Sequence, residues 1–452
     1  MFIINYLVDL GAQVMMPIIF TLFGLIVGLK LGKAIKSGLM IGIGFIGLNI
    51  VITLLTDNLG PAAEQMVKNA GLHLTVIDVG WPAASAIAFG SAVGVLVIPV
   101  GILVNILMLA TKTTKTINVD IWNYWHFAFT GSIVYMLTQD LLVSLLMAAF
   151  NMIVIMVIAD RTAPLVEKEL GLPGISIPHA FTGSFVPIAF AINWLLDRIP
   201  GVNKISLDYK KFQKKVGIFG DPAILGMVIG VILGVIARYD VKGILNLGVV
   251  VAAVLVLMPK MAAILMEGLM PVSEAVQSKL QAKFEGNSKL LIGLDSAIGV
   301  GSPVTLTISL LMIPLTILLA FILPGNEFLP IASLSGLTFM FVLITPICRN
   351  DFFRTLVVGA VVVASALLIG TSIAPIFTKA AVNANFVLPS NSSLISSIDY
   401  GGSFLPYLIV KIAELKWVGV AIGAVTSAAL MIWNRTLIMK EAVVATSDLQ
   451  VD

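Results

Sequence analysis

The stretch Ser91–Ala110 reads SAVGVLVIPVGILVNILMLA and contains no charged residue. Its length of twenty residues is about what an α-helix needs to cross the hydrocarbon core of a bilayer. Similar stretches recur along the 452 residues, of which 59 % are hydrophobic and only 11 % are charged. So few charges cannot cover a soluble surface of this size, whereas lipid covers apolar side chains. The composition therefore predicts a polytopic membrane protein.

The backbone of a membrane-spanning chain must satisfy its hydrogen bonds internally, as helices or as a closed barrel. The apolar stretches lack the alternation of barrel strands, so we expect an all-α fold. The single cysteine, Cys348, excludes an internal disulfide and a thiolate metal cluster, and neither a metal nor a cofactor is expected. About eleven transmembrane helices are predicted, near 11–29, 37–56, 91–110, 123–138, 141–159, 219–237, 243–265, 303–323, 329–348, 352–371 and 417–434.

Sequence landmarks indicate a diverged internal repeat. Each landmark recurs in the same order, 205 to 217 residues further along the chain. One match could arise by chance, but five in order favour a duplicated unit of five helices. The pairs are Pro17 and Pro222, Pro61 and Pro271, Asp78 and Asp295, Pro99 and Pro314, and Asp140 and Asp351.

The distribution of lysine and arginine predicts the orientation of the helices, because basic residues favour cytoplasmic loops. Each repeat has an odd number of spans, so the second copy starts on the opposite side and the repeats are inverted. The N-terminus is then outside and the C-terminus is cytoplasmic. The loops and tail assigned to the cytoplasm carry Lys30, Lys33, Lys36, Lys112, Lys115, Arg161, Lys168, Lys204, Lys210, Lys211, Lys214, Lys215, Lys279, Lys283, Lys289, Arg435 and Lys440.

Four regions follow from this pattern. The first inverted repeat covers 1–159 with a re-entrant hairpin near 78–90, and a cytoplasmic, amphipathic connector covers 160–218. The second repeat covers 219–371 with a hairpin near 290–302, and 372–452 holds an irregular segment, a C-terminal transmembrane helix and a cytoplasmic tail. Inverted repeats with interrupted helices at matching positions indicate a transporter with its site near the membrane midplane.

Ionisable residues at membrane depth are costly and therefore candidates for function. Asp78 and Asp295 stand at the entrances of the two hairpins, where a carboxylate can accept two hydroxyl groups, although each could instead cap a helix. Trp81 could stack on the carbon chain of a sugar or anchor the interface. His126 and His179 could bind substrate or be satisfied structural groups.

Four further polar residues stand at predicted helix starts and are either substrate ligands or N-caps. They are Gln139, Asp140, Asn350 and Asp351.

Several short strings resemble the galactitol-type EIIC permease of the bacterial phosphoenolpyruvate-dependent sugar phosphotransferase system, in the ascorbate/galactitol superfamily. The likeness covers nearly the whole chain. The strings are Asp78-Val-Gly-Trp-Pro82, Asn118-Val-Asp-Ile-Trp122 with Trp125-His126, Ile177-Pro-His179, Ile199-Pro-Gly-Val-Asn203, Tyr239-Asp-Val-Lys-Gly243, Leu280-Gln-Ala-Lys-Phe284, Ile292-Gly-Leu-Asp295, Pro324-Gly-Asn326 and Phe353-Arg-Thr355.

The resemblance implies a homodimer with an elevator-like motion in the bacterial cytoplasmic membrane. It implies a polyol substrate that a separate EIIB subunit, served by EIIA, phosphorylates at the cytoplasmic face. It also strengthens His179 and Asp295 as substrate ligands. Cys348 lies in an apolar context unlike a phosphocysteine loop, so no catalytic residue is assigned and the phosphoryl chemistry is expected from partners. Nothing in the small net charge of +3 indicates a nucleic-acid partner.

Two other functions stay open from the residues alone. An ion-coupled secondary transporter of a sugar or polyol could use the same inverted architecture, with the aspartates titrating. A membrane scaffold or sensor would need no substrate. The identity of the polyol is not determined by the sequence.

Overall fold

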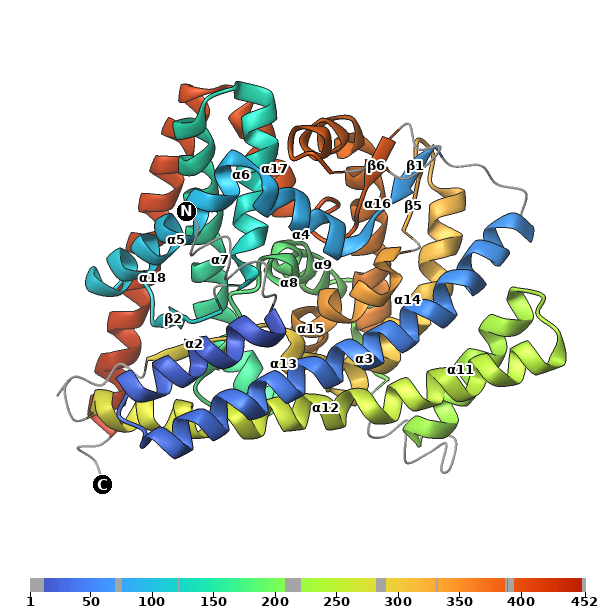
Figure 1. Ribbon diagram of the computed structural model, residues 1–452, viewed down its shortest axis with the longest axis horizontal. Coiled ribbons are helices and arrows are strands. Elements are labelled where there is room, and N and C mark those ends of the chain that lie inside the picture. The colour runs from blue at the N-terminus through green and yellow to red at the C-terminus, as the bar shows by residue number, and fades with distance from the viewer. Residues whose placement is uncertain are drawn as a thin grey trace.

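The computed structural model describes residues 12–69, 75–120, 122–207, 221–281, 290–330, 332–386, 388 and 394–448 (Figure 1). It is mostly helical, and five helices of this described region are long and apolar enough to cross a membrane. The chain is thus a polytopic membrane protein. These helices are α5 (Ala92–Ala110), α7 (Leu141–Leu170), α14 (Pro303–Ile322), α16 (Phe352–Asn383) and the Trp417–Glu441 portion of α18 (Trp417–Asp448).

Several helices extend well past their predicted ends, and in two of them polar residues near those ends are satisfied inside the protein. The predicted end at residue 159 reflects the charged pair that follows, yet Asp160 is buried and α7 continues to Leu170. Gly171 then ends α7 with a φ of 71°, a conformation that glycine adopts without strain. In α16 the Thr371 hydroxyl donates to Leu367 O at 3.1 Å, which lets the helix continue.

One predicted span is much shorter as a helix than its apolar stretch. The segment 329–348 contains the end of strand β5 (Phe328–Leu329), the 3₁₀ turn η4 (Ala332–Gly336) and α15 (Leu337–Ile347), which has 11 residues. Its counterpart at 123–138 follows strand β2 (Thr116–Asn118) and comprises most of η1 (Trp122–Tyr124) and all of α6 (Trp125–Thr138).

Four helices form an arm along one edge of the molecule (Figure 1). They are α2 (Ala12–Ile26), α3 (Leu31–Asn69), α11 (Pro222–Ile236) and α12 (Val241–Gln281). The 39-residue α3 and the 41-residue α12 pack against each other. Small residues let α11 approach α12 closely, because a Cβ at Gly230 would lie 2.5 Å from Leu247 O.

The all-α prediction is wrong in one respect, because six short strands of the described residues form two parallel three-stranded sheets. The backbone of these connecting segments is removed from water, so its N–H and C=O groups pair with one another. The first sheet has the order β5-β1-β6 with β1 (Val76–Asp78) and β6 (Leu394–Ser396). The second has the order β2-β4-β3, with β2 (Thr116–Asn118), β4 (Leu291–Gly293) and β3 (Ile175–Ser176).

The two halves of the chain interlock through these sheets. In each sheet the central strand comes from one half and both flanking strands come from the other. Ile77 of β1 pairs with Leu329 and Ile395, just as Ile292 of β4 pairs with Ile117 and Ile175. Neither sheet can form without both halves.

The strand register corrects one landmark of the internal repeat. When Ile292 is matched to Ile77, Asp78 corresponds to Gly293, and Asp295 corresponds to Gly80. The pairing of Asp78 with Asp295 inferred from the sequence is therefore two residues out of register. The two carboxylates do not occupy equivalent positions.

The remaining elements follow the strands in the same order in both halves. Residues 78–90 hold the end of β1 and α4 (Gly80–Gly90), and residues 290–302 hold β4 and the single turn α13 (Ala297–Val300). After β3 come α8 (Ala180–Ser184) and α9 (Val186–Leu196), then η2 (Val202–Lys204); after β6 comes α17 (Phe404–Ala413).

Candidate functional site

The carboxyl ends of β2, β3 and β4 bring the main polar cluster together. Asn123 follows β2, His179 follows β3 and Asp295 follows β4. Residues that follow neighbouring parallel strands emerge at the same edge of the sheet, where α/β proteins commonly bind ligands. The interlocked strands thus place side chains from both halves of the chain in one buried site.

Asp295 is held by contacts from two directions. Its Oδ1 accepts a hydrogen bond from Ala297 N at 2.8 Å, so the carboxylate caps the first turn of α13. Its Oδ2 accepts from Asn123 Nδ2 at 2.8 Å. His179 Nε2 lies 3.9 Å from Asp295 Oδ1. The cap and the site interpretations of Asp295 are therefore compatible, because Oδ1 caps the turn and also lies near His179, while Oδ2 accepts from Asn123.

Asn123 connects two carboxylates. Its Nδ2 also donates to Asp120 Oδ2 at 2.6 Å, so a single amide separates Asp120 from Asp295. Asp120 is buried, and its Oδ1 has no hydrogen-bond partner in the described residues. A buried carboxylate oxygen without a donor is costly. A hydroxyl group of a ligand would satisfy it.

The hydrogen bonds of His179 allow two tautomers. Its Nδ1 lies 2.9 Å from Thr182 Oγ1, and the Thr182 amide donates to the same nitrogen at 3.4 Å. When the Thr182 hydroxyl donates to Nδ1, the proton sits on Nε2 and faces Asp295. When that hydroxyl donates instead to Phe339 O, 2.8 Å away, Nδ1 carries the proton and donates to Thr182 Oγ1, the bond from the Thr182 amide is lost, and Nε2 becomes an acceptor. His179 can thus serve a hydroxyl in either role.

Aromatic rings form a second wall of the cluster. The centroid of the His126 ring lies 4.5 Å from that of His179 and 4.7 Å from that of Tyr400, and both contacts are edge-to-face. Trp125 stacks on His126 at 3.9 Å. His126 Nδ1 lies 2.8 Å from Asn123 O, which satisfies one nitrogen of this buried ring. Carboxylates, imidazoles and aromatic rings together are suited to a ligand with hydroxyls on a carbon chain.

Tyr400 has an unusual backbone conformation for a large residue, with φ of 72°. It is fully buried, and its hydroxyl is contacted by Asn151 Nδ2 and Thr130 Oγ1. Backbone strain of this kind persists only when the surroundings hold the residue in place. The strained turn after β6 thus supplies a ring to the cluster from the far end of the sequence.

Asp78 and Trp81 lie in a different cluster, at the ends of the other sheet. Asp78 accepts from Ser333 N at 2.6 Å and from Ser333 Oγ at 2.8 Å, and it also caps Gly80 N at 3.0 Å. The Trp81 amide donates to Asp399 Oδ2 at 3.2 Å. Asp399 directly precedes Tyr400, so the two clusters adjoin along the chain. The hydrogen-bond partners of Asp78 thus come from η4 and α4 and not from the strands that carry His179 and Asp295.

The four candidates at helix starts lie at two helix junctions. Asp140 caps α7 by accepting from Leu142 N at 2.9 Å, and Asp351 caps α16 by accepting from Arg354 N at 2.9 Å. Gln139 is exposed and ends α6. Asn350 donates to Glu169 Oε2 at 2.7 Å. None of them contacts the His179 cluster in the described structure.

Asn123, Asp120 and Tyr400 were not among the residues singled out from the sequence. Asn123 and Asp120 belong to the same short polar string as His126, and a buried carboxylate in an apolar chain is itself a signal. Tyr400 carries no such signal, because a tyrosine in a Ser- and Gly-rich segment is common. In the described residues, no group of three or more His, Cys, Asp or Glu side chains is placed to hold a metal ion.

A buried polar cluster inside a multi-pass helical protein is typical of a membrane permease for a small polar solute. Comparison with known proteins agrees: residues 6–391 match the family described as "EIIC-GAT: PTS system sugar-specific permease component". The chain therefore belongs to this family of phosphotransferase-system permeases, which implies EIIB and EIIA partners, a sugar substrate and a bacterial inner membrane.

Individual relatives are similar along nearly their whole length. The galactitol-specific EIIC component of Escherichia coli strain K12 is 38 % identical over 436 residues, which is 96 % of each chain. The protein of the same name from E. coli O157:H7 matches equally well. A putative permease IIC component of strain K12 is 39 % identical over 435 residues, covering 96 % of this chain and 99 % of the relative.

Proposed function

We propose that this chain binds a galactitol-like polyol and translocates it inward, where a separate EIIB subunit phosphorylates it. The observation that carries this proposal is the unsatisfied Asp120 Oδ1 inside a ring of hydroxyl-binding groups. A polyol supplies a hydroxyl on every carbon and no charge, which suits a buried site made of carboxylates, imidazoles and amides. The 38 % identity to a galactitol-specific EIIC component supports this substrate class.

In this proposal Asp295, Asp120 and His179 hold substrate hydroxyls by charge-assisted hydrogen bonds. Asn123 keeps the two carboxylates apart and oriented, and His126 packs along the carbon chain. The chain supplies binding and access, whereas the phosphoryl group comes from EIIB. Phosphorylation would trap the product inside, so that uptake proceeds without an ion gradient.

The proposed movement is elevator-like alternating access within a homodimer of inverted repeats of five helices each, with eleven transmembrane helices in all. The interlocked sheets support it, because strands from both halves join the segments around the site into a single unit. The arm of α2, α3, α11 and α12 is a separate helical layer against which such a unit could move (Figure 1). The N-terminus is proposed to lie outside and the C-terminus in the cytoplasm.

Reconstitution tests this function directly. Proteoliposomes containing the chain, with EIIA, EIIB and the phosphoenolpyruvate-dependent donor proteins inside, should accumulate labelled galactitol as its phosphate. Omitting EIIB should stop accumulation while leaving galactitol binding intact. Accumulation that follows a proton or sodium gradient without EIIB would instead establish the ion-coupled transporter. Competition by unlabelled hexitols and pentitols would rank the substrates.

A further inference from the structure

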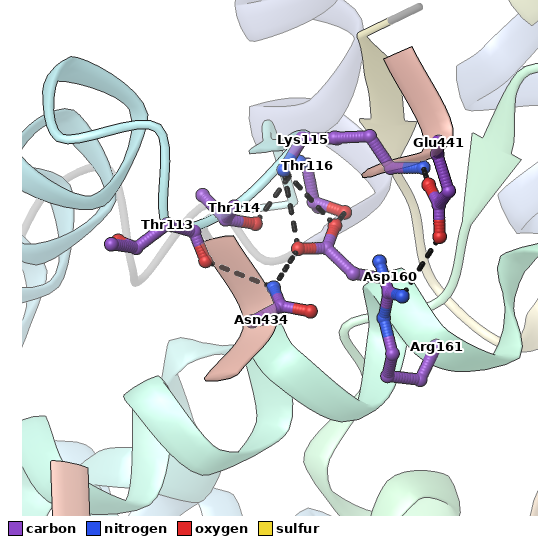
Figure 2. Close-up of polar contacts among 8 residues, drawn as sticks. All are labelled: Thr113, Thr114, Lys115, Thr116, Asp160, Arg161, Asn434 and Glu441. Atoms are coloured by element: carbon purple, nitrogen blue, oxygen red, sulfur yellow. Dashed lines mark hydrogen bonds and ion pairs between the residues drawn. The ribbon is translucent and has the colours of Figure 1, made fainter. Parts of the chain in front are cut away.

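A buried carboxylate on α7 lies outside the candidate site. Asp160 of α7 is 1 % exposed and forms no ion pair in the described region of the chain. Figure 2 shows it at the centre of a polar network, where its two oxygens accept from Lys115 N at 3.2 Å and from Thr116 Oγ1 at 2.8 Å. A buried, unpaired charge persists only where hydrogen bonds compensate it.

The C-terminal helix supplies the remaining donor. Asn434 of α18 is fully buried, and its Nδ2 donates to Asp160 Oδ2 at 2.7 Å and to Thr113 O at 2.9 Å (Figure 2). One amide thus ties α18 both to α7 and to the loop that leads into β2. We call Asp160, Asn434 and Thr116 the anchor.

The anchor reaches the site through the second sheet. Thr116 begins β2, and its hydroxyl oxygen also lies 2.8 Å from Ser176 Oγ of β3. Between these two strands runs β4, whose Leu291 N donates to Lys115 O at 2.8 Å and whose Ile292 N donates to Gly174 O at 3.0 Å. The anchor therefore contacts β2 at its first residue and β3 at Ser176, and β4 lies between these two strands and pairs with both of them.

We infer that Asp160 and Asn434 are positioning residues: they lock α18 to the β2-β4-β3 sheet and so set the spacing of Asn123, His179 and Asp295. The inference rests on the proposed function in so far as that spacing serves a polyol. It makes the C-terminal helix a component of the frame of the binding site. Asn123, His179 and Asp295 belong to three separate segments of the chain. A shift of β2 therefore changes the distances between these residues as well as the stability of the protein.

Two partly exposed ion pairs beside the anchor provide a matched control. Glu441 of α18 contacts Lys115 Nζ at 2.6 Å and Arg161 Nη1 at 2.8 Å, and its side chain is 47 % exposed (Figure 2). Glu441 is the exposed member of both pairs, whereas the side chains of Lys115 and Arg161 are 16 % and 19 % exposed, and water and salt screen the contacts from the Glu441 side. Glu441→Gln removes these contacts while leaving the buried anchor in place.

The first measurement needs no ligand. Hydrogen exchange of purified protein compares wild type with Asn434→Leu, which keeps the volume but removes the donor, and with Glu441→Gln. We expect exchange of the Ile292 and Leu294 amides to accelerate at least tenfold in Asn434→Leu only. The amides of Val76 and Val79, which belong to the other sheet, should not change. Equal exchange in all three proteins at Ile292 and Leu294 would overturn the anchor, whatever the substrate.

The second measurement is the Kd for galactitol by titration calorimetry. Asn434→Leu and Asp160→Asn should raise Kd about tenfold and Glu441→Gln less than twofold. In an Asn123→Ala background, Asn434→Leu should raise Kd by less than threefold, because Asn123 is the site residue that follows β2, the strand that the anchor holds directly through Thr116; a general loss of stability would raise Kd by the same factor in both backgrounds. If wild type binds and Asn434→Leu binds equally well, the positioning role is wrong. If the wild-type protein does not bind galactitol, the proposed substrate is wrong, and the hydrogen-exchange experiment alone tests the role of the anchor.

Discussion

His179 Nε2 lies 3.9 Å from Asp295 Oδ1, although the two residues belong to different halves of the chain. His179 follows β3 and Asp295 follows β4, and these strands are hydrogen-bonded neighbours in one parallel sheet. The pair therefore exists only because the halves interlock. Its position at the edge of the sheet makes it the centre of the proposed substrate site.

Removing either member of this pair should weaken binding more than it weakens folding. A hydrogen bond to a charged group contributes about 1.5–3 kcal/mol, so Asp295→Asn and His179→Ala should each raise the Kd for galactitol by roughly 10- to 100-fold. Titration calorimetry on purified protein measures this. Lys411→Gln, an exposed change on α17, is the control and should bind normally. Wild-type affinity in both site variants would remove the pair from the site.

Asn123→Ala should affect both binding and stability. Its amide separates the Asp120 and Asp295 carboxylates, so its loss leaves two buried acceptors without a shared donor. We expect a loss of about 1–3 kcal/mol in unfolding free energy and a roughly tenfold weaker Kd for galactitol. Asn123→Asp should lower the unfolding free energy and weaken galactitol binding further, because it adds a third carboxylate. Thermal unfolding and calorimetry on the same samples check this; an unchanged melting temperature in both variants would contradict it.

Ser333→Ala tests whether Asp78 belongs to the substrate site. Ser333 donates twice to Asp78, once from its amide and once from its hydroxyl, and alanine retains only the first. Because this cluster holds the other sheet, we expect a loss of about 1–3 kcal/mol in stability with a change in galactitol Kd below threefold. A tenfold weaker Kd at unchanged stability would instead place Asp78 among the substrate ligands.

The orientation in the membrane can be tested with engineered cysteines. Cys348 is fully buried, so it should give little background with a membrane-impermeant maleimide. Asp57→Cys on α3 should be labelled in whole cells, and Lys168→Cys at the end of α7 only in inverted vesicles. Both positions lie on the surface of the protein. The reverse pattern would invert the proposed topology.

The sequence by itself determined that the chain is a mostly helical polytopic membrane protein, and it pointed to part of the candidate site. Apolar stretches of spanning length and the scarcity of charge are sufficient for a polytopic helical protein, because the requirement to satisfy backbone hydrogen bonds in lipid leaves few alternatives. The same scarcity made His126, His179 and Asp295 conspicuous, and the structure brings these three together. A polar residue in an apolar chain is visible without any knowledge of its neighbours.

Only the tertiary structure decided which polar residues share a site. Strands of two or three residues carry too little periodicity to be recognised, since their pairing partners come from distant segments. Their register separated Asp78 from Asp295 and assigned them to different sheets. It also brought in Tyr400, whose role depends on a strained turn. The sequence predicted that the helix ends before Asp160, because a charged residue after an apolar stretch usually lies in water. The burial of Asp160 depends on hydrogen bonds from Thr116 and Asn434, which only the packed fold supplies.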